Sequence, residues 1–260
     1  PATISDNRFV WNADDVGRAC DGGRVKVLLL NTPWNPTGGV FTRDELTGLM
    51  EVARRHNLVV ISDEIYDQFV YEPATHISPI EISDDARSRT ILVNSLSKTY
   101  AMTGWRLGYC AGPAELIRGM YLVLQQSSRG PTTCVQDAGV VALTESQQCV
   151  ADMRDEYLQR FAQVQSALAN VSGVKVMTPA GGFFAMLDVR ELGRPSDEIR
   201  RPSDEIRRFL LNEHHVVVMH GSAYGPAAEG TLRVAFASGG DKLRDGLQRL
   251  RTGLEQLSRA

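Results

Sequence analysis

Two nearly continuous apolar runs, residues 25–30 and 58–62, constrain the fold of this 260-residue chain more than any other feature. Both are short and rich in valine, leucine and isoleucine, which is typical of parallel strands that are covered on both faces. Between them, Thr42 and Glu45 have the spacing of a capping box, and apolar residues follow at helical intervals. A strand, a helix and a second strand of these lengths predict a right-handed crossover, and therefore an α/β fold.

Polar segments follow the predicted strands at the points where they end. Residues 31–39 form a dense turn signal after the first strand, and residues 63–66 follow the second. A third strand at 90–94 leads into a polar loop at 95–106, and a further strand is expected at 107–111. In open α/β sheets, ligands bind beyond the carboxyl ends of the strands, so we expect a binding site there.

The loop at 95–106 contains the groups that a phosphate and an aldehyde require. Hydroxyls and a guanidinium suit a phosphate dianion, and a lysine held in a cleft can form a Schiff base with an aldehyde. The loop supplies these groups as Ser95, Ser97, Lys98 and Arg106. Taken alone, the same residues also fit a basic surface loop.

The pattern Ser-x-Ser-Lys, followed by Gly-x-Arg-x-Gly-Tyr, resembles the cofactor-lysine motif of fold-type I pyridoxal phosphate enzymes, the class I and II aminotransferases. Further motifs match that family in order: Asn-x-Pro-x-Asn-Pro-Thr-Gly at 31–38, Asp-Glu-x-Tyr at 63–66 and Arg-x-x-Phe-Ala at 233–237. The resemblance covers the chain from about Val25 to its end. It implies a pyridoxal-phosphate-transferase-like large domain with a mostly parallel sheet, here incomplete, and a smaller α+β C-terminal domain.

The resemblance implies roles for three residues around the cofactor ring. Lys98 is the Schiff-base lysine, and it also moves the substrate's α-proton as general base and acid. Asp63 is the carboxylate beside the pyridine nitrogen, where opposite charges attract, and Tyr66 donates to the ring oxygen. Without the resemblance, Asp63 is an exposed acid at a strand end and Tyr66 an ordinary half-buried tyrosine. Glu64 has no role that we can assign.

The resemblance also implies how the phosphate and the substrate are held. The phosphate is assigned to Ser95, Ser97 and Arg106. Asn35 donates to the ring oxygen and touches the substrate carboxylate, which Arg233 binds with its guanidinium fork. A cis peptide bond is implied between Asn35 and Pro36. The alternatives are a plain turn at Asn35 and a structural ion pair at Arg233.

Two domains are expected, with residues 1–146 as the C-terminal part of the large cofactor-binding domain and 147–260 as a connector helix and small domain. We expect helices at 113–126, 131–144, 147–170 and 241–257, and late strands at 174–177, 183–188, 215–219 and 231–236. A seven-residue repeat, Arg-Pro-Ser-Asp-Glu-Ile-Arg, occupies 194–200 and 201–207. Because proline is unfavourable within a helix, we expect a helix to start at Ser203 and the first copy to bulge out.

Composition limits the partners and the compartment. The net charge of −3 gives no reason to expect binding to nucleic acid or to an anionic membrane, and no apolar run approaches the roughly 20 residues of a membrane span. The four cysteines are scattered, which fits reduced thiols in the cytoplasm, and no histidine or cysteine spacing indicates a metal site. We therefore expect a cytoplasmic protein, and the resemblance implies a homodimer for the full-length form.

The chain begins at Pro1, shortly before the first predicted strand. If the resemblance holds, an N-terminal part is missing that carries the glycine-rich phosphate loop, the aromatic residue that stacks on the ring and a tyrosine donated across the dimer. We therefore expect the 260-residue chain alone to be inactive. We also expect apolar surface to be left exposed on the strands at 25–30, 58–62 and 90–94.

The function that the resemblance implies is pyridoxal phosphate-dependent transamination between an L-amino acid and a 2-oxo acid. Two alternatives stay open at this point. One is a lyase or decarboxylase that uses the same cofactor and fold. The other is the non-catalytic, aminotransferase-like sensor domain of a transcription regulator.

Overall fold

The computed structural model describes residues 2–5, 8–192 and 202–259, which divide into two compact units. The first unit contains residues 11–34 and 40–154. The second contains residues 35–39 and the described residues before 11 and after 154. Each unit is described by itself.

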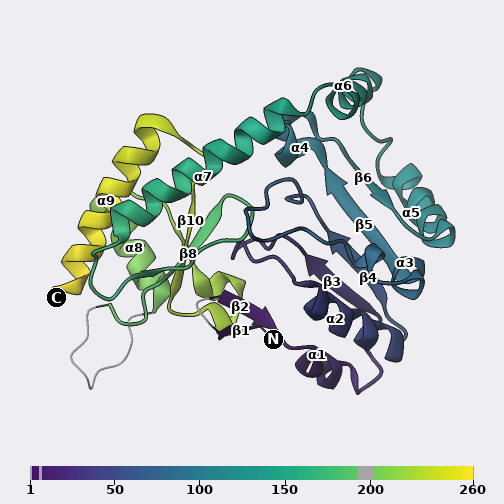
Figure 1. Ribbon diagram of the computed structural model, residues 1–260, viewed down its shortest axis with the longest axis horizontal. Helices are drawn as coiled ribbons and strands as arrows, with labels where there is room; N and C mark the ends of the chain where they lie inside the picture. The colour runs from purple at the N-terminus through teal and green to yellow at the C-terminus, as the bar shows by residue number, and fades with distance from the viewer. Residues whose placement is uncertain (1, 6–7, 193–201, 260) are drawn as a thin grey trace. The chain divides into compact units, whose positions relative to one another are not determined.

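The first unit is built on a four-stranded sheet in the order β3-β4-β5-β6 (Figure 1). Its members are β3 (Val27–Asn31), β4 (Val59–Asp63), β5 (Thr90–Ser95) and β6 (Gly108–Ala111). The first three strands run parallel, and β6 joins β5 antiparallel. The expected α/β class with a mostly parallel sheet is confirmed.

One face of this sheet is covered by α1 (Ala13–Cys20) and α2 (Arg43–Arg55), which contact each other (Figure 1). The predicted capping box starts α2, because Thr42 Oγ1 accepts from the Glu45 amide and Glu45 Oε2 accepts from the Thr42 amide. The inner face of α2 packs on alternate residues of β3 and β4. This core contains Leu28, Leu30, Leu46, Leu49, Met50, Val52, Ala53, Leu58 and Val60.

The other face of the sheet is open on the same strands. Val27 and Leu29 of β3 are 47% and 61% exposed, whereas their neighbours Leu28 and Leu30 are buried. In β4, Val59 and Ile61 are half-buried. The expected exposed apolar surface is therefore confirmed for β3, whereas the apolar residues at 58–62 and 90–94 are buried or half-buried.

The first unit also contains α5 (Ala114–Ser127) and α6 (Thr133–Thr144), both near their expected positions. Between β4 and β5, where the sequence analysis names no helix, lie a 3-10 turn, η1 (Pro79–Glu81), and α3 (Asp84–Arg89). Ser83 caps α3 by accepting from the Ala86 amide. Serine followed by two aspartates is a helix-start signal, so this helix was detectable and was missed.

The helix α7 (Gln148–Leu168) begins in the first unit and continues in the second, close to the range expected for the connector. The second unit contains an antiparallel sheet in the order β7-β8-β10-β9 and two further helices. Their bounds are β7 (Lys175–Val176), β8 (Phe184–Asp188), β9 (Met219–His220), β10 (Thr231–Ala235), α8 (Ser203–His214) and α9 (Gly240–Ser258). A separate two-stranded sheet joins β1 (Ala2–Ser5) and β2 (Arg8–Trp11).

One expected strand of the second unit is wrong. The strand predicted at 215–219 is reduced to β9, because His215 adopts a left-handed conformation, with φ 55°, and ends α8. The amide of Val216 then donates back to the carbonyl of Leu210 at 3.0 Å. The first valine after His215 is therefore hydrogen-bonded to the last turns of α8 and does not belong to a strand.

The second copy of the seven-residue repeat behaves as expected, since α8 begins at Ser203. Glu229 fixes this start by accepting from the Ser203 amide at 2.7 Å and from its hydroxyl at 3.1 Å. The first copy, at 194–200, lies outside the described residues. Among the residues that are described, none of the helices combines the length and the apolar character needed to span a bilayer.

The two faces of β3 predict losses of stability of very different size for the same truncation. Leu30→Ala removes a fully buried side chain and should lower the free energy of unfolding by about 2–5 kcal/mol. Leu29→Ala changes an exposed residue of the same strand and should lower it by less than about 1 kcal/mol. Urea unfolding followed by circular dichroism measures both values. Equal losses would contradict the assignment of one covered and one open face.

Candidate active site

The carboxyl ends of β3, β4 and β5 meet at one edge of the parallel sheet. The register places Asp63 between Asn31 and Val93. The carbonyl of Asp63 accepts from Asn31 Nδ2 and from the Thr32 amide, each at 3.0 Å. The backbone of Asp63 is therefore tied to β3 from one side, and its position is set by the sheet.

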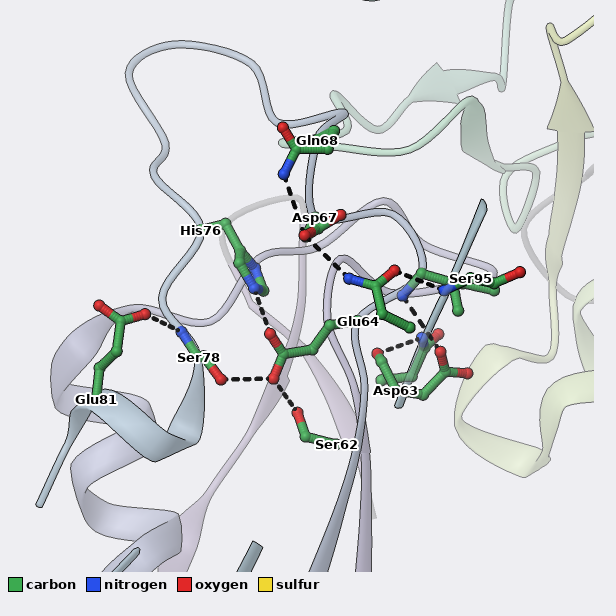
Figure 2. A network of polar contacts seen from close by, with 12 residues as sticks. Ser62, Asp63, Glu64, Asp67, Gln68, His76, Ser78, Glu81 and Ser95 are labelled. Carbon is green, nitrogen blue, oxygen red and sulfur yellow. Dashed lines mark hydrogen bonds and ion pairs between the residues drawn. The ribbon is translucent and has the colours of Figure 1, made fainter. Parts of the chain in front are cut away.

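The carboxylate of Asp63 is half-buried, and its Oδ1 accepts from the Ile65 amide at 3.3 Å (Figure 2). Burial raises the pKa of this carboxyl above its ordinary value, the Ile65 amide partly offsets that effect, and the charge of Glu64 adds to it. A cation beside this carboxyl would stabilise its ionised form, which burial disfavours.

Tyr66 lies in the turn that follows β4. This turn is formed by the Asp67 amide donating to the Glu64 carbonyl at 3.0 Å and by the Phe69 amide donating to the Tyr66 carbonyl at 2.9 Å. The ring of Tyr66 is buried. The chain thus delivers a phenol three residues after Asp63, in a part of the loop with a defined backbone.

The lysine-containing loop begins where β5 ends. Ser95 caps the short helix α4 (Leu96–Thr99), since its Oγ accepts from the Ser97 amide at 3.1 Å and donates to the Leu107 carbonyl at 3.0 Å. Lys98 is half-buried within α4, and Ser97 is buried. The only proton of the Ser95 hydroxyl is therefore committed to Leu107, so this hydroxyl would have to rotate to bind a phosphate.

Arg106 closes the same loop just before β6. It has a left-handed backbone, with φ 56°, and its exposed side chain donates from Nη1 to the Thr103 carbonyl at 2.9 Å. A guanidinium has five N–H donors, so this one bond leaves capacity for an anion. The structure thus places Ser95, Ser97, Lys98 and Arg106 on one loop that is closed by the Ser95–Leu107 bond.

The second unit contains Asn35 and Arg233, which are 198 positions apart and bonded to each other. Arg233 Nη1 donates to Asn35 Oδ1 at 2.8 Å. The guanidinium carbon lies 4.7 Å from the Phe184 ring centre and 5.5 Å from that of Tyr224. Arg233 Nε is buried and has no hydrogen-bond partner among the described residues.

This arrangement of Arg233 differs from a structural ion pair, because its partner is a neutral amide and aromatic rings lie against it. A buried N–H without a partner is costly, and a carboxylate ligand would satisfy it. The contact between Arg233 and the Phe184 ring was not predicted from the sequence.

The expected cis peptide bond between Asn35 and Pro36 is wrong. Within the described residues the cis bonds precede Pro33 and Pro73, so the bond before Pro36 is trans. The turn motif at 31–38 therefore contains its cis bond three residues earlier than expected. The preference of a particular X-Pro bond depends on tertiary context that the motif alone does not provide.

Sequence reasoning also missed two sets of polar residues behind the site. Glu64 is buried and bonded to Ser62, His76 and Ser78. In a second set, Asn94 donates to Asp67 at 3.1 Å and accepts from the Ser95 amide at 2.7 Å (Figure 2). The one available signal was Glu64 itself, a second acid directly after an apolar strand.

The residues of the first unit fit pyridoxal phosphate by their chemistry. The desolvated Asp63 carboxylate suits a protonated ring nitrogen. The loop from Ser95 to Arg106 provides an amine, hydroxyls and a guanidinium, which suit the aldehyde and the phosphate. These residues could therefore hold the ring nitrogen, the aldehyde and the phosphate of the cofactor.

Comparison with known proteins agrees with this chemistry. A family model described as "Aminotransferase class I and II" matches residues 4–250. An aspartate aminotransferase of Pyrococcus abyssi is 35% identical over 98% of this chain and 63% of its own length. An aromatic-amino-acid aminotransferase 2 of Thermococcus litoralis is 34% identical over the same shares of both chains.

A solved structure of an aminotransferase is similar to this chain in both sequence and fold. That of an aromatic aminotransferase from Pyrococcus horikoshii matches with a TM-score of 0.89 at 34% identity, over 98% of this chain and 66% of the solved one. The chain spans about 57% to 64% of the length of curated relatives that it matches.

We expect Asp63→Asn to stabilise the chain in the absence of cofactor. The folded-state pKa of Asp63 lies above the ordinary value of 3.8, so its ionisation opposes folding. The carboxyl contributes its full stability at acid pH and loses it as the pH rises through the raised pKa. The variant should therefore gain stability over the wild type at pH 7, and the gain should shrink toward pH 4. Urea unfolding at both pH values measures this difference, and a gain that grows toward acid pH would contradict it.

Proposed function

The chain belongs to the class I and II aminotransferases, and we propose that it carries the cofactor lysine of a pyridoxal phosphate-dependent transaminase. The reaction would transfer an amino group from an L-amino acid to a 2-oxo acid. One observation carries the proposal: Lys98 lies in the loop that follows β5, and Asp63 ends the neighbouring strand β4 in register with Val93. An amine and a desolvated carboxylate thus follow adjacent parallel strands.

Pyridoxal phosphate is the cofactor of this family, and when bound it supplies an aldehyde and a ring that accepts electrons released at the substrate's Cα. Lys98 Nζ is the proposed attachment point. As a free amine, Nζ would act as the general base that takes the proton from the substrate Cα and as the general acid that gives it up again. Asp63 would hold the ring nitrogen in its protonated form through its negative charge.

The remaining residues would orient the cofactor and the substrate. Tyr66 would donate its hydroxyl proton to the ring oxygen. Ser95, Ser97 and Arg106 would bind the phosphate, with Ser95 exchanging its bond to Leu107 for one to a phosphate oxygen. Asn35 and Arg233 would bind the substrate carboxylate, because Arg233 Nε has no hydrogen-bond partner within the described part of the chain and its fork suits two oxygens.

No observation favours the lyase or the sensor alternative, since the matched relatives are named as aminotransferases. Their names include both aspartate and aromatic amino acids, so the proposal names the substrate class as L-amino acids. A cytoplasmic homodimer belongs to the proposal as well. So does the division into a cofactor-binding part at 1–146 and a connector with small domain at 147–260.

The test measures cofactor attachment rather than turnover, because the chain spans only part of its relatives' length and is expected to be inactive alone. The chain has four lysines, Lys26, Lys98, Lys175 and Lys242. After incubation with pyridoxal phosphate and reduction with borohydride, mass spectrometry should find the adduct on Lys98. Lys98→Ala should abolish the main adduct and the absorbance of the bound cofactor, whereas Lys175→Ala, at an exposed ion pair with Glu191, should change neither. An equal yield of adduct in Lys98→Ala would refute the assignment.

A further inference from the structure

A buried carboxylate without a role in the reaction lies directly beside Asp63. Glu64 is 2% exposed, and its Oε1 accepts from the hydroxyls of Ser62 and Ser78, each at 2.7 Å (Figure 2). Its Oε2 lies 2.8 Å from His76 Nε2. We call these four residues the Glu64 network. Burying a carboxylate is costly unless it is bonded, and three polar partners around one side chain meet that requirement.

The network holds the chain on both sides of Asp63. Side chains alternate along a strand, so Ser62 and Glu64 point to one face and Asp63 to the other. The hydrogen bond between Ser62 and Glu64 therefore joins the residues on either side of Asp63, on the face opposite to the Asp63 side chain. In addition, the Glu64 amide donates to the Val93 carbonyl at 2.9 Å, which ties the same point of the chain to β5.

The network also closes the loop that carries Tyr66. The chain leaves β4 at Glu64, turns through Tyr66 and returns at residues 76–78, where His76 and Ser78 bond to Glu64. The returning segment is itself fixed, since the Ser78 amide donates to Glu81 Oε1 at 2.9 Å at the start of η1. Glu64 thus joins the two ends of a loop whose backbone must keep Tyr66 in place.

His76 depends on Glu64 for its place in this loop. Its side chain is largely buried, and its Nδ1 has no hydrogen-bond partner among the described residues. The contact with Glu64 Oε2 is then the polar contact that orients the ring. Removing the Glu64 carboxylate would leave His76 and two serine hydroxyls without a shared acceptor in the interior, which is unfavourable.

We propose that Glu64 and His76 are positioning residues, which hold Asp63 and Tyr66 in the geometry needed to bind the ring of the cofactor. This inference rests on the proposed function of the site. Residues that hold reacting groups must keep them within about 0.5 Å of the productive geometry. Outer partners of functional side chains can have large effects, and around metal ligands their loss costs about 10–100-fold in affinity.

The shape and the charge of Glu64 can be separated by substitution. Glu64→Gln retains an acceptor for the two serines and an amide group that can donate to a neutral His76. It removes the negative charge, which is one of the causes that raise the pKa of Asp63. Glu64→Ala removes the acceptor altogether. A positioning role therefore predicts that Glu64→Ala weakens the binding of the cofactor and that Glu64→Gln retains it.

The experiment measures the dissociation constant of pyridoxal phosphate for the full chain from the absorbance of the bound cofactor. Hydrogen exchange of peptides covering residues 62–69, without cofactor, provides a second measurement. Glu64→Ala and His76→Ala should weaken cofactor affinity by about tenfold or more and speed exchange in these peptides. Glu64→Gln should stay within about threefold of the wild type, a shift below one kcal/mol.

The control is Glu229→Ala, which removes an exposed carboxylate of the second unit that accepts from the amide and from the hydroxyl of Ser203. It should lower stability without changing the affinity for pyridoxal phosphate or the exchange of residues 62–69. If Glu64→Ala does not fold, Glu64→Gln and His76→Ala still decide the question.

Three outcomes would overturn the inference. Wild-type affinity in both Glu64→Ala and His76→Ala would show that the network does not position the cofactor site. Equal losses in Glu64→Gln and Glu64→Ala would show that the charge matters and not the shape. If the wild-type chain formed no adduct on Lys98, the proposed function would fail and this inference with it. If the wild-type chain formed the adduct but Glu64→Ala and His76→Ala bound the cofactor as tightly as the wild type, this inference alone would fail.

Discussion

The register between the parallel strands β3, β4 and β5 is the constraint on which the rest of the site depends. It aligns Asn31 with Asp63 and Asp63 with Val93, so that the polar segments after three strands start at one edge of the sheet. A slip of one residue would turn Asp63 to the opposite face. The Asn31–Asp63 bond and the Glu64 amide bond to Val93 hold this register where the regular ladder ends.

The same sheet accommodates an unfavourable group at this edge. Asp63 is half-buried next to a second acid, and both burial and Glu64 raise its pKa. Such a group opposes folding when it is ionised, and it is held in place by a well-packed core on the α2 side. Groups of this kind cluster at functional sites, and here the desolvated carboxylate is what a cationic ring nitrogen would require.

Much of the fold could be predicted because its signals are local. The apolar runs, the capping box at Thr42 and the start of α8 at Ser203 each depend on neighbouring residues, and each is confirmed. The family could also be predicted, since its motifs are short and ordered, and the family match confirms it. The Glu64 network could not, because it joins residues 12 to 14 positions apart through a loop of irregular backbone. The trans bond before Pro36 likewise depends on tertiary packing.

The proposed site requires that Asp63 faces the ring nitrogen of a cofactor attached to Lys98. The most direct measurement is the pKa of the Asp63 carboxyl by carbon-13 NMR, with the signal assigned by its absence in Asp63→Asn. Without cofactor, the pKa should lie above the ordinary value of 3.8. With pyridoxal phosphate on Lys98 it should fall below that value, because a protonated ring nitrogen favours the carboxylate. An unchanged pKa in a chain whose Lys98 is modified would contradict the claim.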